Sequence, residues 1–140
     1  MQNTDVSVAG ALIPERSEIV LASPSLTITA PDRGDSQARV MRARGDLDSA
    51  TAPQLQDVLQ QRLQDGDRAV LDLCAVDFLG VAGVEVLIEA NRRSPISLVA
   101  QRGPVRRSLA ITGADDELAV HPTLVDAELS MDGTALTAVP

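Results

Sequence analysis

Apolar and polar residues alternate along the first part of the chain, which is the pattern of strands with one buried face. Leu26-Thr27-Ile28-Thr29 follows this pattern, and a turn-forming cluster runs from Pro31 to Asp35. Ala38 to Ala43 forms the next predicted strand, which Gly45 and Asp46 end. We therefore predict a hairpin in this region.

The first helix is predicted after this hairpin. Thr51-Ala52-Pro53-Gln54 has the form of a capping box, in which a proline is tolerated in the first turn. Apolar residues then recur at helical spacing, namely Leu55, Val58, Leu59 and Leu63. Gly66, after Asp65, is the expected stop of this helix.

The rest of the chain alternates short apolar runs with helical segments. Ala69 to Leu73 has the length and composition of a central strand covered on both faces. The later predicted elements are a helix at 81–93, a strand at 96–99, a helix at 105–111 ended by Gly113, a short strand at 118–120 and a weaker helix at 124–131. Strands that alternate with helices indicate an α/β domain with a partly parallel sheet. Residues 1–24 keep no sustained period and are predicted as an N-terminal extension, in which Ile19-Val20-Leu21 can pair as an edge strand.

The second helix has an apolar arc and a polar arc. At about 100° per residue, Val84, Leu87, Ile88 and Asn91 share one arc, and Glu85, Glu89, Arg92 and Arg93 share the opposite one. Val81 falls at the border of the polar arc, so we expect its side chain near the surface at the helix start. A helix start exposes unpaired N–H groups that suit a hydroxyl or a carboxylate, and Gly80, Val81 and Ala82 offer neither.

Composition favours a protein as the partner. The formal net charge is −8, and Phe78 is the only aromatic residue, so both the phosphate-binding surface and the base-stacking platforms of a nucleic-acid-binding protein are missing. Electrostatic steering instead favours a basic partner surface. Direct DNA or RNA binding is therefore not expected.

The same composition indicates a soluble, cytoplasmic protein. Cys74 is the only cysteine, so no intramolecular disulfide can form. The chain begins Met1-Gln2-Asn3-Thr4-Asp5, without the basic region of a secretory signal, and no apolar run approaches the roughly 20 residues that a membrane span needs. We expect no membrane insertion.

One segment carries a family resemblance. Asp72 to Val84 closely resembles the signature of the STAS domain, specifically that of the bacterial anti-sigma factor antagonists. The segments Gly45-Asp46-Leu47-Asp48, Ala50-Thr51-Ala52-Pro53, Leu109 to Gly113, and His121-Pro122-Thr123 with Ala127 resemble further parts of that family in the same order. The resemblance implies a single STAS-like α/β domain at 25–131, with a mixed sheet of four or five strands and about four helices. Residues 1–24 then form an extension, and 132–140 a C-terminal tail.

The resemblance also implies a function. Anti-sigma factor antagonists bind an anti-sigma factor, usually a protein kinase, and free the sigma factor that it holds. The kinase reverses this by phosphorylating a Ser or Thr in an Asp-Ser-x-Gly motif at the start of the second helix. Here Gly80 stands at the Asp position and Val81 at the acceptor position, so no phosphate can be accepted there. The alternative is a divergent STAS module that serves a sensory scaffold or a lipid-transport complex.

The resemblance places the turn before the first helix beside the start of the second helix. We predict that these two segments form the partner-binding surface, with Val84 partly supporting it from below; its members are Asp46, Asp48, Ser49, Thr51, Gly80, Val81, Ala82, Gly83 and Glu85. For Asp46 and Asp48 a purely structural role in the turn is the rival interpretation, and for Val81 it is an ordinary contact with Leu79. No catalytic residue, cofactor or metal is predicted, so the chain is not expected to be an enzyme. A homodimer is left open.

Other residues have simpler interpretations. Cys74 is expected to be a small buried core residue. His121 is the only histidine, so a Ser-His-Asp triad or a histidine metal site has no support. Asp115-Asp116-Glu117 is predicted as a solvated loop. The basic group of Arg92, Arg93, Arg102, Arg106 and Arg107 is predicted as a solvated face, with a second contact surface as its alternative. If regulation has moved off the second helix, Thr4 is a candidate modification site.

Overall fold

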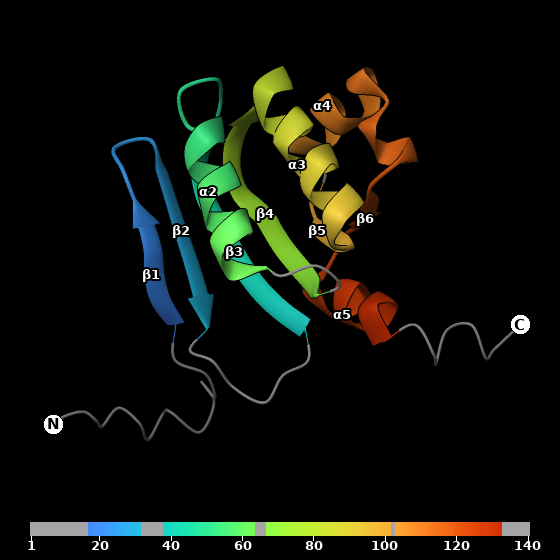
Figure 1. Ribbon diagram of the computed structural model, residues 1–140. Helices are drawn as coiled ribbons and strands as arrows, with labels where there is room; N and C mark the ends of the chain where they lie inside the picture. The colour runs from blue at the N-terminus through green and yellow to red at the C-terminus, as the bar shows by residue number, and fades with distance from the viewer. Residues whose placement is uncertain (1–16, 32–37, 64–66, 102, 133–140) are drawn as a thin grey trace, which may run out of the picture.

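A computed structural model of the 140-residue protein describes residues 17–31, 38–63, 67–101 and 103–132. Its centre is one six-stranded sheet in the order β1-β2-β3-β4-β5-β6 (Figure 1). The strands are β1 Ser17–Ala22, β2 Leu26–Pro31, β3 Ala38–Leu47, β4 Arg68–Leu79, β5 Ile96–Val99 and β6 Ala119–His121. β1, β2 and β3 pair antiparallel, and β3 to β6 pair parallel. The mixed sheet and the predicted hairpin are thus confirmed.

The sheet has one strand more than the four or five predicted. The additional strand, β1, lies within the predicted extension at the position of Ile19-Val20-Leu21 and pairs with β2 along the edge of the sheet. Val20 and Leu21 pack partly buried against the core, which gives this short segment a reason to add to the sheet. The edge-strand alternative is therefore the one that the structure shows.

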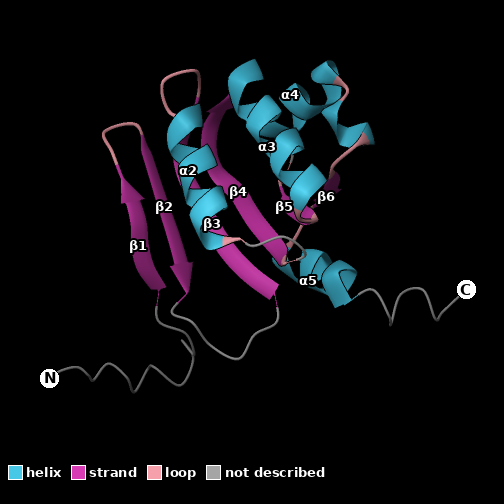
Figure 2. Ribbon diagram, viewed as in Figure 1, coloured by secondary structure: helices cyan, strands magenta, loops and turns pink. Residues whose placement is uncertain are grey.

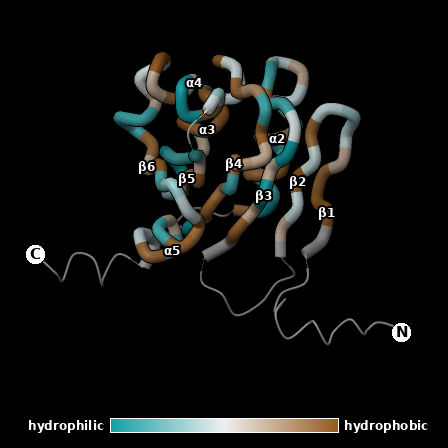
Figure 3. Tube along the Cα trace, turned by 180° about the vertical axis from the view of Figure 1, so that it is seen from behind, coloured by the Kyte–Doolittle hydropathy of each residue, from teal (hydrophilic) through white to brown (hydrophobic). Residues whose placement is uncertain are grey.

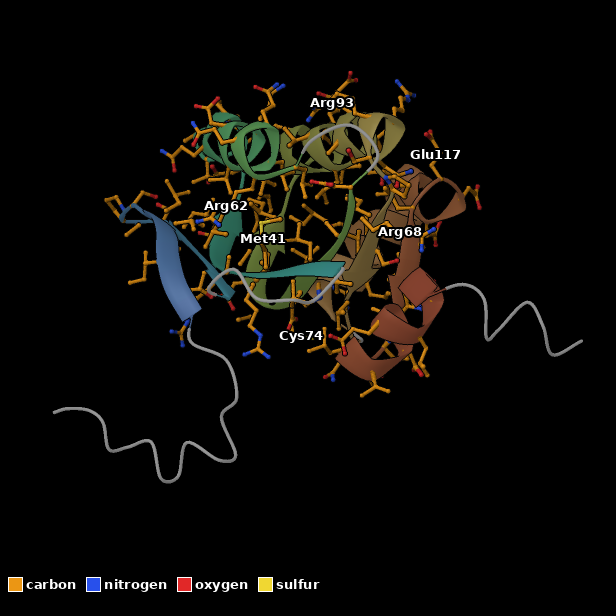
Figure 4. All side chains as sticks on the ribbon, turned by 60° about the horizontal axis from the view of Figure 1, so that its bottom comes forward. Met41, Arg62, Arg68, Cys74, Arg93 and Glu117 are labelled. Carbon is orange, nitrogen blue, oxygen red and sulfur yellow. The ribbon has the colours of Figure 1, made fainter. Side chains whose placement is uncertain are left out.

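Helices cover the two faces of the sheet unequally. The helices are α2 Ala52–Arg62, α3 Val81–Arg93, α4 Pro104–Thr112 and α5 Leu124–Asp132, with a 3-10 helix, η1, at Ala114–Asp116. α2 and α3 lie side by side over one face, and α5 lies against the other (Figures 2 and 4). The four predicted helices are confirmed. The segment predicted as a solvated loop differs in part, because Asp115 and Asp116 belong to η1, although their side chains are exposed.

Two apolar clusters hold the layers together. The larger one fills the space between the sheet and helices α2, α3 and α4 and contains, among others, Leu55, Leu71 and Leu87. The smaller one joins Val70 and Val99 of the sheet to Ala127 of α5. Each fully buried aliphatic side chain contributes about 1.5–3 kcal/mol. Along the trace, hydrophobic and hydrophilic positions interleave, as expected of elements that are buried on one side (Figure 3).

Strand β4 is longer than predicted and carries two bulges. Against β3, the register shifts between Arg42 and Arg44 and again between Gly45 and Asp46, and each time β4 contributes the additional residue. The side chains of β4 in the larger cluster are therefore unevenly spaced, and they are Ala69, Leu71, Leu73, Val76 and Leu79. A simple alternation from Leu71 and Leu73 would have turned Ala75 and Asp77 inward in place of Val76, and the second bulge restores the original phase at Leu79.

The prediction that Cys74 is a buried core residue is wrong. Because β4 continues past Leu73, alternation turns Cys74 away from α2 and α3, and the residue is exposed (Figure 4). Partial removal of the thiol from water, together with the neighbouring Asp72 carboxylate, raises the pKa of Cys74 to about 11. The thiol is therefore protonated at neutral pH and unreactive by comparison with an ordinary exposed cysteine.

Candidate functional site

The ends of β3 and β4 bring the two predicted halves of the site together. Leu47 and Leu79 are partners in the last pair of the parallel ladder, and the N–H of Gly80 donates to the carbonyl oxygen of Leu47 at 2.8 Å. At this end of the sheet, β3 leads into α2 and β4 leads into α3 (Figure 1). The segments 46–51 and 80–85 therefore lie side by side, as predicted.

The turn from Asp46 to Thr51 is closed by its own side chains. The Thr51 hydroxyl donates to the carbonyl oxygen of Asp46 at 2.8 Å and accepts from the N–H of Asp48 at 2.9 Å. The Asp48 carboxylate accepts from the N–H groups of Ala50 and Thr51 at 2.9 and 3.0 Å. These hydrogen bonds hold the pKa of Asp48 below its ordinary value, and the bond from the Thr51 N–H has the largest effect. The turn is thus a preformed, polar structure.

The predicted capping box is not formed. Thr51 precedes α2 with helical backbone angles (φ −97°, ψ −18°), whereas a capping side chain acts from an extended residue. Its hydroxyl is committed to Asp46 and Asp48, and Gln54 Oε1 is buried with no hydrogen-bond partner among the described residues. Thr51 is only 3% exposed, so it shapes the surface from inside. Ser49, by contrast, is exposed at the tip of the turn.

The start of α3 is open. Gly80 precedes the helix in an extended conformation, and no side chain caps it. Val81 is 63% exposed, which confirms the surface position that the helical wheel predicted and leaves little of its side chain for a packing contact. Ala82 is half-buried and Glu85 is exposed, while Gly83 and Val84 are buried beneath them.

Gly83 allows α3 to approach the sheet closely. A Cβ at this position would lie 2.9 Å from Leu79 Cδ1, 3.0 Å from Leu47 Cβ and 3.1 Å from the Leu47 carbonyl oxygen. Such distances leave no room for a side chain. Gly83 therefore positions the helix start by its close packing on Leu47 and Leu79.

Phe78 belongs to the same surface, although it was not among the predicted site residues. It is paired with Asp46 at the end of β4, and it is 51% exposed. The first bulge of β4 turns Val76 toward the core, and the second turns Leu79 toward the core and Phe78 outward. The three-residue spacing of Val76 and Leu79, together with the fact that Phe78 is the only aromatic residue, is the signal in the sequence that could have identified it.

Two of the arginines predicted as a basic face have partners within the chain. Arg92 forms ion pairs with Glu89 and Glu117 at 3.9 and 3.7 Å, and Arg106 donates to the carbonyl oxygen of Ala100 at 3.0 Å. Arg102 and Thr4 lie outside the described residues. His121 belongs to β6 and pairs with Val99 of β5.

The described part of the chain holds no group of three or more His, Cys, Asp or Glu side chains arranged to bind a metal ion. Within those same residues, no helix has both the length and the apolar character that crossing a membrane requires. The candidate surface combines a polar turn, an uncapped helix start and two exposed apolar side chains, Phe78 and Val81.

Comparisons with known proteins match this architecture. The family model described as "Mlab, STAS domain" matches residues 32–126. Anti-sigma-F factor antagonist RsfB of Mycobacterium tuberculosis is 32% identical over 117 residues, which are 80% of this chain and 94% of that protein. A crystal structure of an anti-sigma factor antagonist from Mycobacterium paratuberculosis is similar with a TM-score of 0.66 and 31% identity, over 85% of this chain and 98% of that one.

A more distant match shows the fold alone. The structure of the murine anion transporter Slc26a9 is similar over 91% of this chain and 24% of its own, with a TM-score of 0.63 and 15% identity. The predicted α/β, STAS-like fold is confirmed by the mycobacterial structure, which covers nearly all of its own chain at 31% identity. By its family match, its relatives and its fold, the chain belongs to the STAS domain family.

Proposed function

We propose that this chain is an anti-sigma factor antagonist, which acts in the cytoplasm by binding a kinase-type anti-sigma factor and so releasing a sigma factor. The names of its mycobacterial relatives support this function. The observation that carries it is the open start of α3, held beside the closed turn 46–51, with Val81 exposed at the phospho-acceptor position of the family motif. The chain works by binding, and residues 25–131 are its functional domain.

The valine has a direct consequence for regulation. A phosphate would bring about −1.5 to −2 charges into this surface and would disrupt a contact made with a neutral side chain. Val81 offers no hydroxyl, and neither Gly80 nor Ala82 replaces it. The antagonist is therefore active without dephosphorylation, and its abundance or a signal elsewhere in the chain, such as a modification of Thr4, controls it.

The proposal is tested with the purified chain and a sigma factor bound to its kinase-type anti-sigma factor from the same organism. We expect the chain to form a stable complex with the anti-sigma factor in size-exclusion chromatography and to displace the sigma factor. With ATP added, intact-mass spectrometry should detect no phosphate on residues 80–85. Failure to bind any anti-sigma factor of that organism, or a phosphate at the start of α3, would contradict the proposal.

The second candidate is a divergent STAS module in another complex, such as a sensory scaffold or a lipid-transport complex. The observation that favours it is the same departure from the Asp-Ser-x-Gly motif at Gly80 and Val81. Affinity capture from the native cytoplasm distinguishes the two, because recovery of a different assembly without an anti-sigma factor is expected only for the divergent module.

A further inference from the structure

Two exposed apolar side chains flank the start of α3 in the sequence. In the described residues six large apolar side chains are exposed, and only Phe78 and Val81 belong to the candidate site. Phe78 ends β4 and Val81 begins α3, with only Leu79 and Gly80 between them. Leu79 is buried, so the two exposed side chains border the same helix start.

The ring of Phe78 lies over the residue that caps α3. A Cβ at Gly80 would be 3.0 Å from Phe78 Cε2 and 3.3 Å from Phe78 Cζ. A side chain at position 80 would therefore require the ring of Phe78 to shift by a few tenths of an ångström. The backbone angles of Gly80, φ −94° and ψ 179°, would suit any residue.

The two departures from the family motif thus have one structural result. An Asp at position 80 would add an acidic side chain next to the ring, and a Ser at position 81 would replace the exposed aliphatic side chain with a hydroxyl. With Gly80 and Val81, the helix start presents an aromatic ring and an aliphatic side chain instead. Phe78 is 51% exposed and Val81 is 63% exposed, so both have substantial area left to bury against a partner.

Acidic side chains surround this apolar pair. Asp77 is exposed next to Phe78, Glu85 is exposed one turn after Val81, and Asp46 and Asp48 belong to the neighbouring turn. Acidic side chains outnumber basic ones here, because the chain contains no lysine and has no arginine in residues 45–61 or 69–91; Arg44, exposed on β3 two residues before Asp46, is the basic residue nearest to the turn in the sequence. A surface of this kind is complementary to an apolar pocket with a basic rim.

We propose that Phe78 and Val81 are the anchor of the partner-binding surface and insert into an apolar pocket of the anti-sigma factor that is bordered by basic side chains. Buried aromatic anchors commonly dominate the binding energy of an interface, whereas charges at the rim act mainly on the association rate and on specificity. This inference rests on the proposed function and adds to it the residues that provide the affinity.

The anchor is tested by isothermal titration calorimetry of Phe78→Ala and Val81→Ala against the anti-sigma factor. We expect Phe78→Ala to weaken binding by about 30-fold and Val81→Ala by about fivefold. The matched controls are Leu129→Ala and Val125→Ala on α5, which shorten apolar side chains that are 44% and 62% exposed away from the site. Both controls should bind as the wild type does.

The basic rim is tested by stopped-flow association. Asp77→Asn combined with Glu85→Gln should slow association by about threefold to tenfold at low salt and reduce its salt dependence. The control Asp126→Asn combined with Glu128→Gln makes the same change of charge on α5 and should leave the rate unchanged.

A measurement without any variant keeps the result independent of folding. Phe78 is the only phenylalanine, so ring-labelled protein gives NMR ring signals from this side chain alone. We expect these signals to shift or broaden when the anti-sigma factor is added. Wild-type protein that fails to bind would overturn the proposed function and the anchor together. Wild-type protein that binds with unchanged ring signals, and with Phe78→Ala at full affinity, would overturn the anchor alone.

Discussion

The two helix starts at the C-terminal ends of β3 and β4 differ in how they satisfy their polar groups. Before α2, Asp48 and Thr51 use their side chains on the backbone of their own turn, at distances of 2.8–3.0 Å. Before α3, no side chain caps the helix, and Phe78 and Val81 are exposed. One start is therefore closed by its own chain, and the other is left for a partner.

The contrast lies in the side chains, while a backbone hydrogen bond links the two segments. The N–H of Gly80 donates to the carbonyl oxygen of Leu47, so the open start is positioned by the closed one. A rigid turn next to an exposed apolar pair lowers the cost of ordering a binding surface when the partner arrives.

Gly80→Asp combined with Val81→Ser should have the largest effect, because it restores Asp-Ser-x-Gly with Ala82 and Gly83 already in place. We expect phosphorylation by a kinase-type anti-sigma factor to rise from none to near completion, as measured by intact-mass spectrometry with ATP present. Gly80→Asp alone, which adds no hydroxyl, is the control. A double variant that binds the kinase and takes up no phosphate would show that more than these two residues prevents the reaction.

Gly83→Ala should lower the free energy of unfolding by about 1–3 kcal/mol, because the new methyl group meets Leu47 and Leu79 in a space with no room for it. The measurement is urea denaturation followed by circular dichroism. The sign of the change is decisive, since Gly→Ala at an unhindered helix position stabilises by about 0.5–1 kcal/mol. A more stable variant would mean that α3 does not need this close approach.

Thr51→Val should cost about 1–2 kcal/mol of stability, because the valine keeps the shape of threonine but leaves the Asp46 carbonyl and the Asp48 N–H without their partner. Ser49→Ala is the matched control in the same turn, and it should change stability by less than about 0.5 kcal/mol. Equal effects of the two substitutions in thermal denaturation would contradict the hydrogen-bonded account of the turn.

Asp48→Asn should give the smallest effect, and one that depends on pH. The pKa of Asp48 is lowered in the folded protein, so its stabilising contribution is present above the unfolded carboxyl pKa of about 3.9 and is lost as the pH falls through the lower, folded value. We expect the wild type to exceed the variant in melting temperature by a constant margin at neutral pH, and the margin to narrow below about pH 4. A margin that widens as the pH falls would contradict a stabilising role of the ionised Asp48 carboxylate.

Much of the fold could be predicted from the sequence, because repeating patterns report which face of an element is buried. The helices containing Leu55 and Leu87 and the strands containing Ile28 and Leu71 all form where the periodicity placed them. One residue of the candidate site followed in the same way, since the wheel of α3 alone predicted an exposed Val81.

The errors share a physical cause. The exposure of Cys74 depends on how far β4 continues past Leu73, and the orientations of Val76, Phe78 and Leu79 depend on its two bulges; both are properties of the pairing with β3 and not of the residues themselves. Thr51 and Gln54 have the residue types of a capping box, but the hydroxyl finds closer acceptors in the turn that precedes it. Local patterns do not contain these competing partners.

The sequence by itself determined the α/β class, the missing hydroxyl at position 81 and the exposure of Val81, because residue type and periodicity are local properties. Only the tertiary structure decided that Phe78 is exposed, that its ring lies next to Gly80 and that Asp46 is its partner in the β3–β4 ladder. These features arise where two strands and two helices meet, so their geometry depends on long-range strand pairing and packing.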